Sequence, residues 1–433
     1  MAASPSTPAF GPEEARRILD HLQHPAVFPD MSRDWPVLRW TAERLARRLP
    51  DKLIPFRLGN RRWRNGPLFE TQCSYAEATL AQFLCWTRGG AGADMGRLSK
   101  YPRSQFWAYA DYKYIATLLA DQPSMFQDVR WSHFGLEGRD GRHSTLWVGS
   151  EGANTPCHLD SYGWNLVLQV EGRKRWLLFP PEDTDKLYPT RIPYEESSVF
   201  SQVDVLRPDL RRFPAFRGAA VHTVTLQPGQ VLFVPRHWWH YVESVDPVTV
   251  SVNSWMELES DDVARVGEAL TKTIVCALKS ARSDDNTDDW LNPTEEGASP
   301  HSDNMQLVSL AVAACAARRG RRPGRGVKRD SDGHVRKRRG SAAAFRVPYG
   351  PHLLPVPRRE EQEQEESRAE EEQEEPAGSR GSAEELSSGR TTVSTNDLLD
   401  CLLHPEVISR VTQLLLERHA PTHRPPDPTD PPY

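Results

Sequence analysis

Asn154-Thr-Pro-Cys-His-Leu-Asp160 is the stretch from which the fold and the chemistry of this chain can be predicted. Its His158 and Asp160 are two residues apart, and in an extended strand side chains at that spacing point to the same face. Two imidazoles and one carboxylate can hold Fe(II) on one side and leave its other positions open for substrate chemistry. We interpret Asn154-Thr-Pro156 as a turn that leads into the strand.

The third metal ligand has to come from a neighbouring strand. In a barrel of short antiparallel strands His240 can lie beside the first pair, because it follows an apolar run. A structural role for each histidine stays open as the alternative, since the chain has 14 histidines and a His-x-Asp pair can arise by chance. Strands are predicted at residues 166–170, 223–226, 231–234 and 248–255, with a turn at 227–230.

Further motifs follow one another in order along the first part of the chain. They are Trp35-Pro-Val-Leu-Arg-Trp40, Glu171-Gly-Arg-Lys-Arg-Trp-Leu-Leu-Phe-Pro-Pro181, Leu187-Tyr-Pro189, Pro228-Gly-Gln-Val-Leu-Phe-Val-Pro235 and Trp238-Trp-His240. Together with residues 154–160 they resemble the JmjC-domain oxygenases, and within these the branch of the asparaginyl hydroxylase that acts on hypoxia-inducible factor. The resemblance implies an all-β core with helical flanks, folded as a double-stranded β-helix (a jelly roll of the cupin, JmjC type).

The resemblance also implies the cofactors, Fe(II) and the cosubstrate 2-oxoglutarate. His158, Asp160 and His240 fall on the metal-ligand positions of the family. Lys174 falls on the lysine that pairs with the distal carboxylate of 2-oxoglutarate, and Thr155 on the hydroxyl that binds the same carboxylate. A cation is needed there because an unpaired carboxylate inside an apolar barrel is costly.

Three more residues are assigned to the cosubstrate pocket by the resemblance. Asn165 and Asn253 fall on two asparagines near the metal-binding end of 2-oxoglutarate. Tyr109 supplies a further hydroxyl, with Trp107 and Tyr112 as competing assignments in the same segment. Thr155 and Asn165 have a second interpretation as simple turn residues.

The spacing between Asp160 and Asn165 is one residue longer than in the hydroxylase pattern. Gly163 lies within this stretch and can accommodate a bulge that restores the register. Without the bulge, Asn165 points away from the pocket and its assignment fails.

The function implied by the resemblance is hydroxylation of a side chain on a polypeptide. A second class is a JmjC-fold adaptor with little or no turnover, which binds a protein partner such as a small heat-shock protein. A third class is a lysine demethylase, which usually carries zinc-binding fingers. The six cysteines of this chain form no C-x-x-C pair, which disfavours such fingers.

Composition places the chain in a reducing compartment. It has no signal peptide and no long apolar stretch, so we expect neither secretion nor a membrane span, and place it in the cytoplasm with the nucleus as the alternative. A net charge of -5 does not indicate a nucleic-acid partner. Trp238, Trp239 and Trp255 are expected to pack in the core rather than to contact substrate.

Four regions are predicted. Residues 1–100 form a helical or mixed region that packs on the barrel, and residues 101–280 form the JmjC double-stranded β-helix. Aromatic residues become rare after residue 280, so residues 281–394 are expected to be a disordered, charged linker, with a basic run at 318–339 and an acidic run at 360–375.

The last region, residues 395–420, has leucine and valine at helical spacing. Asn396 and the residues after it are expected to cap the helix, and Pro405 to kink it or split it in two. Two roles stay open for this segment. One is packing on the catalytic domain, and the other is formation of a homodimer.

Overall fold

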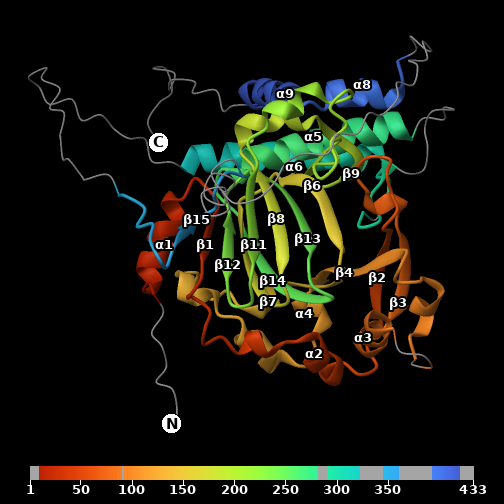
Figure 1. The fold of residues 1–433 in the computed structure, drawn as a ribbon. Helices are drawn as coiled ribbons and strands as arrows, with labels where there is room; N and C mark the ends of the chain where they lie inside the picture. Colours follow the sequence, from red (N-terminus) through yellow and green to blue (C-terminus); the bar gives the residue numbers. More distant parts are fainter. Residues whose placement is uncertain are drawn as a thin grey trace, which may run out of the picture.

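Two antiparallel β-sheets form the core of the molecule (Figure 1). The computed structural model describes residues 9–89, 92, 94–280, 290–295, 297–321, 345–359 and 393–419. The larger sheet has nine strands in the order β15-β1-β12-β7-β14-β5-β4-β2-β3, and the smaller has six in the order β11-β8-β13-β6-β10-β9. This arrangement confirms the double-stranded β-helix with an all-β core and helical flanks.

The strands are β1 Ala26–Phe28, β2 Ile54–Asn60, β3 Ser74–Ala78, β4 Phe106–Tyr114, β5 Thr145–Ser150, β6 Asn154–Asp160, β7 Trp164–Glu171, β8 Lys174–Phe179, β9 Pro189–Glu195, β10 Ser198–Ser201, β11 His222–Leu226, β12 Val231–Val234, β13 Trp239–Ser244, β14 Val248–Met256 and β15 Leu354–Pro355. The α-helices are α1 Pro12–His21, α2 Ala42–Arg48, α3 Leu80–Arg88, α4 Ile115–Leu118, α5 Asp261–Lys279, α6 His301–Arg321, α8 Thr395–Leu402 and α9 Pro405–Arg418. Short 3-10 helices lie at Pro36–Arg39, Glu70–Gln72, Gly96–Lys100, Pro123–Asp128, Trp131–Phe134, Gly141–His143, Pro181–Leu187 and Pro214–Gly218.

Strand β14 illustrates how the sequence builds the barrel. Its Val250 and Val252 are fully buried in the main hydrophobic core. The alternating Ser251 and Asn253 line a cavity between the two sheets. A period of two thus separates an apolar outer face, which packs on the core, from a polar inner face that is available for chemistry.

Each of the four predicted runs is a strand and the turn at residues 227–230 is present, but one detail differs. Asn154 to Pro156 are not a turn, because strand β6 already begins at Asn154 and pairs there with Glu243 of β13. The turn at residues 227–230 joins β11 of the smaller sheet to β12 of the larger one. The chain therefore crosses between sheets at this turn, as a jelly roll requires.

The N-terminal part of the chain contributes strands to the larger sheet. Strand β1 pairs with β12, while β2 pairs with β4 and with β3. Phe56 of β2 stacks on Phe83 of α3 with ring centroids 4.8 Å apart, which attaches this helix to the extended sheet. The larger sheet thus runs across the boundary predicted at residue 100.

Helix α6 lies within residues 281–394, so the prediction that this whole segment is disordered is wrong. Val308, Val312 and Cys315 recur at helical spacing and are buried with Val266 of α5. Alanine-rich segments form helices without any aromatic residue, so the loss of aromatics after residue 280 is a poor guide to disorder. Strand β15, in the same segment, pairs with β1 and forms one edge of the larger sheet.

The C-terminal segment forms two helices, as predicted, because Pro405 is the first residue of α9. The cap of α8 is Ser394, in a capping box with Asp397, and not Asn396. Both helices lie over α5 (Figure 1), and Leu399 and Leu403 are buried with Val275 of α5. The opposite side exposes apolar residues, so a homodimer through these helices stays a prediction. The exposed residues are Leu398, Leu402, Val407, Val411 and Leu414.

Most of the predicted charged linker lies outside the described residues. This applies to the acidic run at 360–375 and to residues 322–339 of the basic run. Arg318, at the start of that run, lies in α6, and its guanidinium pairs with the Asp262 carboxylate at 2.8 Å. Within the described ranges, no helix has the length and apolar character needed to cross a membrane.

Candidate metal centre

His158, Asp160 and His240 converge between strands β6 and β13. Their potential ligand atoms all lie within 4.8 Å of one another. His158 and His240 are directly paired across the two strands, with ring centroids 4.2 Å apart. His158 Nε2 lies 3.7 Å from Asp160 Oδ1. The spacing of two in β6 and the neighbouring strand β13 therefore bring together the three side chains that the sequence indicates.

Both imidazoles are held in the orientation that a metal ligand needs. His158 Nδ1 lies 2.9 Å from the Pro156 carbonyl oxygen, and His240 Nδ1 lies 3.0 Å from the Trp238 carbonyl oxygen. A carbonyl only accepts hydrogen bonds, so each Nδ1 donates and each Nε2 keeps a free lone pair. Burial and the neighbouring His240 lower the pKa of His158 to about 4, so this ring is neutral at physiological pH.

Asp160 is oriented by a tryptophan. The indole Nε1 of Trp255 donates a hydrogen bond of 2.9 Å to Asp160 Oδ2, while Oδ1 faces His158. Outer hydrogen bonds of this kind fix the direction of a ligating carboxylate. The expectation that Trp255 only packs in the core is therefore wrong, whereas Trp238 and Trp239 are buried in hydrophobic clusters as predicted.

Lys174 is a buried ammonium group without an acid beside it. Its side chain is 2% exposed, and Nζ donates to the hydroxyls of Ser251 at 2.8 Å and Tyr109 at 3.1 Å. Within the part of the chain that the structure describes, no carboxylate lies within ion-pair distance of it. Burial lowers the pKa of Lys174 to about 7, although the more distant Asp111 opposes the shift.

The two asparagines form a chain of hydrogen bonds in the same cavity. Asn253 Nδ2 donates to Asn165 Oδ1 at 2.9 Å, and Trp147 Nε1 donates to Asn253 Oδ1 at 2.8 Å. Gly163 has a φ of 50°, and a Cβ atom there would lie 1.7 Å from the Met256 carbonyl oxygen. Glycine thus accommodates the extra residue, and Asn165 points into the cavity as its assignment requires.

Strand β4 carries the three competing residues of this segment, and two of them lie at the cavity. Tyr109 and Tyr112 both line the cavity, whereas Trp107 does not. The register of β4 against β5 shifts between Ala110 and Lys113, and Tyr112 has a φ of 51°. This bulge turns Tyr112 to the same side as Tyr109. Tyr109 also hydrogen bonds to Thr155, which brings that hydroxyl beside the Lys174 group.

All eight residues assigned from the sequence except Asp160 line one narrow cavity, and Asp160 completes the metal cluster at its mouth. The histidines lie on one part of its wall and the unpaired Lys174 on another. This donor set fits a divalent cation held by two imidazoles and a carboxylate, together with an anionic ligand that neutralises the ammonium group. The lining residues are Tyr109, Tyr112, Trp147, Thr155, His158, Asn165, Val167, Lys174, Trp176, His240, Val242, Ser251, Asn253 and Trp255.

Besides Trp255 and the apolar Val167 and Val242, three lining residues were given no role in the sequence analysis, namely Ser251, Trp147 and Trp176. Ser251 precedes Asn253 by two residues on β14, so period-two spacing is a signal that could have identified it. Trp147 acts through its contact with Asn253, and the ring of Trp176 stacks near His240 at 5.9 Å. These contacts depend on which strands are neighbours, which no local pattern reveals.

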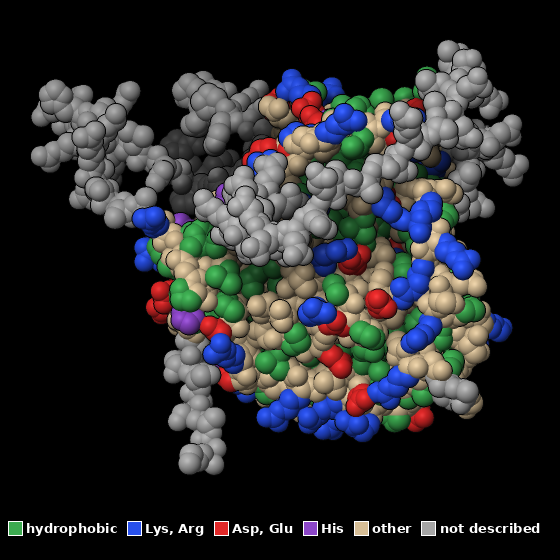
Figure 2. All heavy atoms as spheres, in the orientation of Figure 1, with side chains coloured by type: hydrophobic (Ala, Val, Ile, Leu, Met, Phe, Trp, Pro, Cys, Tyr) green, Lys and Arg blue, Asp and Glu red, His purple; other side chains and the backbone are tan. Residues whose placement is uncertain are grey.

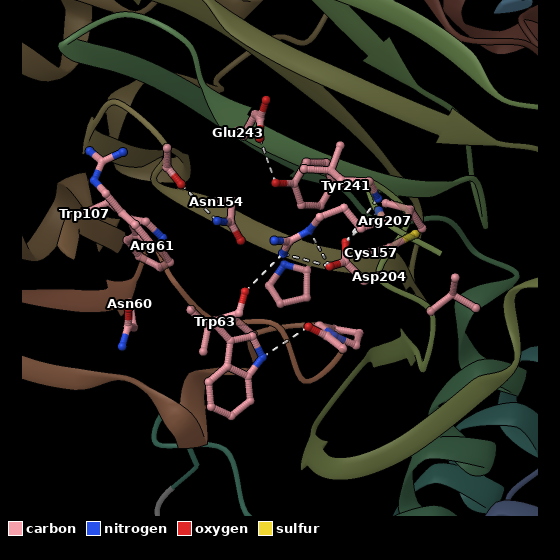
Figure 3. Close-up of a pocket in the computed structure, with 18 residues that line it drawn as sticks. Asn60, Arg61, Trp63, Trp107, Asn154, Cys157, Asp204, Arg207, Tyr241 and Glu243 are labelled. Carbon is pink, nitrogen blue, oxygen red and sulfur yellow. Dashed lines mark hydrogen bonds and ion pairs between the residues drawn. The ribbon is translucent and has the colours of Figure 1, made fainter. Parts of the chain in front are cut away.

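The opposite face of β6 lines a second cavity, of about 320 Å³ (Figure 3). Asn154 and Cys157 face it, together with Arg61 and Arg207. Arg207 points across the cavity to the Asp204 carboxylate, at 2.9 Å, and to the Trp63 carbonyl oxygen, at 3.3 Å. Its guanidinium is therefore already paired. Burial raises the pKa of the Cys157 thiol, which makes this cysteine unreactive.

Comparison with known proteins identifies relatives along the whole chain. A family described as "Cupin-like domain" matches residues 12–262. The chain is 53% identical to the HSPB1-associated protein 1 homolog of Danio rerio, over 96% of this chain and 100% of that protein. It is 46% identical to HSPB1-associated protein 1 of Homo sapiens, over 94% of each. It is also 28% identical to Lysine-specific demethylase 8 of Xenopus tropicalis, over 54% of this chain and 48% of that protein.

Proposed function

Because the chain belongs to the cupin-like JmjC family, we propose that it is an Fe(II)- and 2-oxoglutarate-dependent dioxygenase that hydroxylates a side chain of a protein. The observation that carries this proposal is the pairing of two features in one cavity. The His158, Asp160 and His240 cluster can hold a divalent cation, and the buried Lys174 lacks the acid that would neutralise it. A dicarboxylate that also binds the metal satisfies both.

Each residue has a defined task in this proposal. His158 and His240 offer Nε2 to the metal because their Nδ1 atoms are engaged with carbonyl oxygens. Asp160 offers Oδ1 because Trp255 holds Oδ2. When bound together, Fe(II) and 2-oxoglutarate supply the oxidation of a C–H bond by dioxygen, with 2-oxoglutarate converted to succinate and CO2.

The remaining residues hold the cosubstrate and keep water out. Lys174, steadied by Tyr109 and Ser251, is placed to bind the distal carboxylate, and Thr155 adds a hydroxyl. The rings of Trp147 and Trp176 line the cavity and exclude water from it. A water-poor site strengthens the attraction between the ammonium group and a carboxylate.

A second candidate is an adaptor that binds a small heat-shock protein with little turnover. The observation that favours it is the name of two relatives, HSPB1-associated protein 1 of Homo sapiens and its Danio rerio homolog. We propose the same partner for this chain, either as a bound protein or as the substrate. A demethylase is the third candidate, on the strength of the distant demethylase relative.

The test begins with an anaerobic Fe(II) titration of the full chain and continues with an assay of 2-oxoglutarate decarboxylation in air. The dioxygenase proposal expects Fe(II)-dependent release of CO2 that His158→Ala abolishes and that the control His301→Ala, an exposed histidine on α6, retains. Candidate proteins should stimulate the reaction and gain one oxygen atom by mass spectrometry. Release of formaldehyde instead would favour demethylation.

The adaptor candidate predicts a different pattern. The wild-type chain would release no CO2, and both wild type and His158→Ala would capture HSPB1 equally well. That result would contradict the dioxygenase proposal. Decarboxylation that no candidate protein stimulates would count against protein hydroxylation in particular.

A further inference from the structure

A larger cleft, of about 540 Å³, opens next to the candidate metal centre. Asp160 lies on its wall, and Tyr112 and Trp255 line both this cleft and the inner cavity. The walls come from β3, β4, β9 and β14 and from residues 293–295. The cleft therefore adjoins the candidate metal ligands and is large enough to admit a side chain of another molecule.

Carboxylates dominate the lining of the cleft. One of the described residues that line the cleft is basic, Lys113, and its Nζ donates to the Asp111 carbonyl oxygen at 2.6 Å. The face of the molecule in Figure 2 carries many Lys and Arg side chains, in contrast to the acidic lining of the cleft. The acidic residues are Glu70, Asp111, Asp160, Glu195, Glu196, Glu257 and Glu295.

Four of these acids lie within ion-pair distance of a cation, and two of the four share Arg57. The pairs, with N–O distances, are Glu70 with Arg57 at 3.7 Å, Asp111 with Arg57 at 2.6 Å, Glu257 with Arg265 at 2.7 Å and Glu295 with Lys272 at 3.7 Å. Asp160 belongs to the metal cluster. The carboxyl groups that lack any cation partner in the described part of the chain are therefore those of Glu195, the last residue of β9, and Glu196, which follows it.

Glu195 is a buried carboxylate that lacks a cation. It is 8% exposed, and the hydrogen bond found for its side chain comes from the Thr294 hydroxyl at 3.3 Å. Arg191 lies close by, but its guanidinium binds the Glu268 carboxylate and reaches only the backbone oxygen of Glu195. Among the described residues no basic group lies within ion-pair distance of Glu195 or of Glu196 at the exposed rim.

The electrostatics of the cleft favour an added positive charge. Burial, with the repulsion of Glu70 and Glu295, raises the pKa of Glu195 to about 8. Burial likewise raises the pKa of Glu70 to about 7, although Arg57 opposes the shift. A cation placed between these groups would relieve the repulsion and stabilise their charged forms.

Aromatic rings stand among the carboxylates. Tyr75, Tyr112, Tyr162 and Trp255 line the cleft, and ring faces attract cations. One ring of this wall already holds a guanidinium, since Arg265 lies 4.7 Å from the centroid of Tyr162. A cleft that combines rings with unpaired carboxylates matches the ammonium or guanidinium group of a side chain, and repels phosphates.

We propose that this cleft binds a lysine or arginine side chain of the polypeptide substrate against Glu195 and Glu196, so that the oxidised residue lies at or near a basic residue. The inference rests on the proposed function, because it takes the bound polypeptide to be the substrate of that reaction. It deepens that function by naming the substrate class. The selection of basic peptides is a binding property, however, and it can be measured without turnover.

The experiment presents a randomised peptide library to the immobilised full chain, kept anaerobic with Fe(II) and 2-oxoglutarate, and the bound peptides are identified by mass spectrometry. Wild type should enrich peptides that contain Lys or Arg. The double variant Glu195→Gln/Glu196→Gln should lose this enrichment by about tenfold or more, because a buried charge pair is broken. The control Glu43→Gln, an exposed glutamate on α2 that pairs with Arg88, should retain it.

Two further variants guard against misfolding. Glu196→Asp keeps the charge and should keep the enrichment, while Glu196→Gln at the exposed rim should reduce it even if the buried change is not tolerated. Unchanged enrichment in a folded Glu195→Gln/Glu196→Gln variant, or no basic enrichment by wild type, would overturn the inference. Admitting air to the same samples separates the dioxygenase function from the selection of basic peptides. Enrichment of basic peptides without decarboxylation of 2-oxoglutarate refutes only the proposed function. Decarboxylation without that enrichment refutes only the inference.

Discussion

Arg57 and Lys174 are both buried cations in the barrel, but their surroundings differ. Arg57 is fully buried and contacts Asp111 at 2.6 Å and Glu70 at 3.7 Å. Lys174 is 2% exposed, and among the described residues its ammonium group hydrogen bonds to the hydroxyls of Tyr109 and Ser251 and lies near the rings of Tyr109 and Trp147, with no acid in ion-pair distance. Burial alone would lower the pKa of both groups. The two acids raise the pKa of Arg57 well above its ordinary value, whereas that of Lys174 falls to about 7.

Under the proposed function, the difference separates a charge that supports the fold from one that binds the cosubstrate. A buried ion pair that is complete within the chain supports the fold, and breaking it leaves a partner uncompensated. A buried cation without an acid destabilises the ligand-free protein and is retained for the ligand that neutralises it. Each of the following predictions tests one side of this contrast.

The largest effect is expected for Arg57→Met. This change leaves Asp111 and Glu70 buried without their cation, and it should lower the free energy of unfolding by about 3–5 kcal/mol. Urea denaturation followed by circular dichroism measures it. The matched control is Arg173→Met, which breaks the exposed pair with Asp246 and should leave the midpoint nearly unchanged. Equal losses in the two variants would contradict a structural role that is special to Arg57.

The next largest effect is expected on cosubstrate binding by Lys174→Met. Loss of a buried charge partner should weaken 2-oxoglutarate binding about 100-fold, measured by anaerobic calorimetry in the presence of Fe(II). In wild type the binding of a carboxylate requires the charged ammonium, whose pKa is about 7 in the free protein. Affinity should therefore be flat below about pH 7 and should fall by up to about tenfold per pH unit above it.

The variant supplies its own control for that pH dependence. Lys174→Met should bind weakly at every pH, with no fall above neutrality that depends on this residue. A pH profile that is the same in wild type and variant would show that another group controls binding, and would remove Lys174 from the proposed pocket.

The contrast also explains how far the sequence alone can lead. His158, Asp160, His240 and Lys174 lie in local motifs, and a period of two is enough to predict which way the first pair points. The strand pattern predicts an antiparallel β fold, and the resemblance to the JmjC-domain oxygenases implies the double-stranded β-helix. The acid partners of Arg57 lie on β4 and in a 3-10 helix, so no local pattern distinguishes this arginine from the exposed ones.

The parts that escaped prediction share one physical cause, which is dependence on packing between distant segments. Trp255 resembles any core tryptophan until β14 is placed beside β7, where its indole reaches Asp160. Tyr112 points into the cavity because of a bulge in β4, and no local sequence pattern predicts that bulge. Helix α6 is only weakly amphipathic. It is stabilised by packing of its buried side chains against α5.

A smaller effect is expected for Trp255→Phe, which keeps the ring but removes the hydrogen bond to Asp160. Without that donor the carboxylate rotates more freely, so the affinity for Fe(II) should fall about 10–100-fold in an anaerobic equilibrium dialysis. Trp40→Phe is the matched control, because Trp40 donates a similar bond of 2.8 Å to Asp128, far from the site. The prediction fails if both substitutions leave Fe(II) affinity unchanged.

The smallest effect concerns the stability of the ligand-free protein, where Lys174→Met should raise the free energy of unfolding by about 1–2 kcal/mol at about pH 6. The pKa of Lys174 is near 7 when folded and ordinary when unfolded, so between these values the unfolded chain binds the extra proton and wild-type stability rises with pH. The stability advantage of Lys174→Met over wild type should therefore be greatest below pH 7 and shrink toward about pH 9. Urea unfolding at about pH 6 and about pH 9 measures it.

Arg57→Met must instead lower the free energy of unfolding at both of these pH values, because the charge of Arg57 is already matched within the fold. An Lys174→Met variant less stable than wild type would mean that its two hydroxyl contacts outweigh the burial of the charge, and Lys174 would then be structural, as Arg57 is.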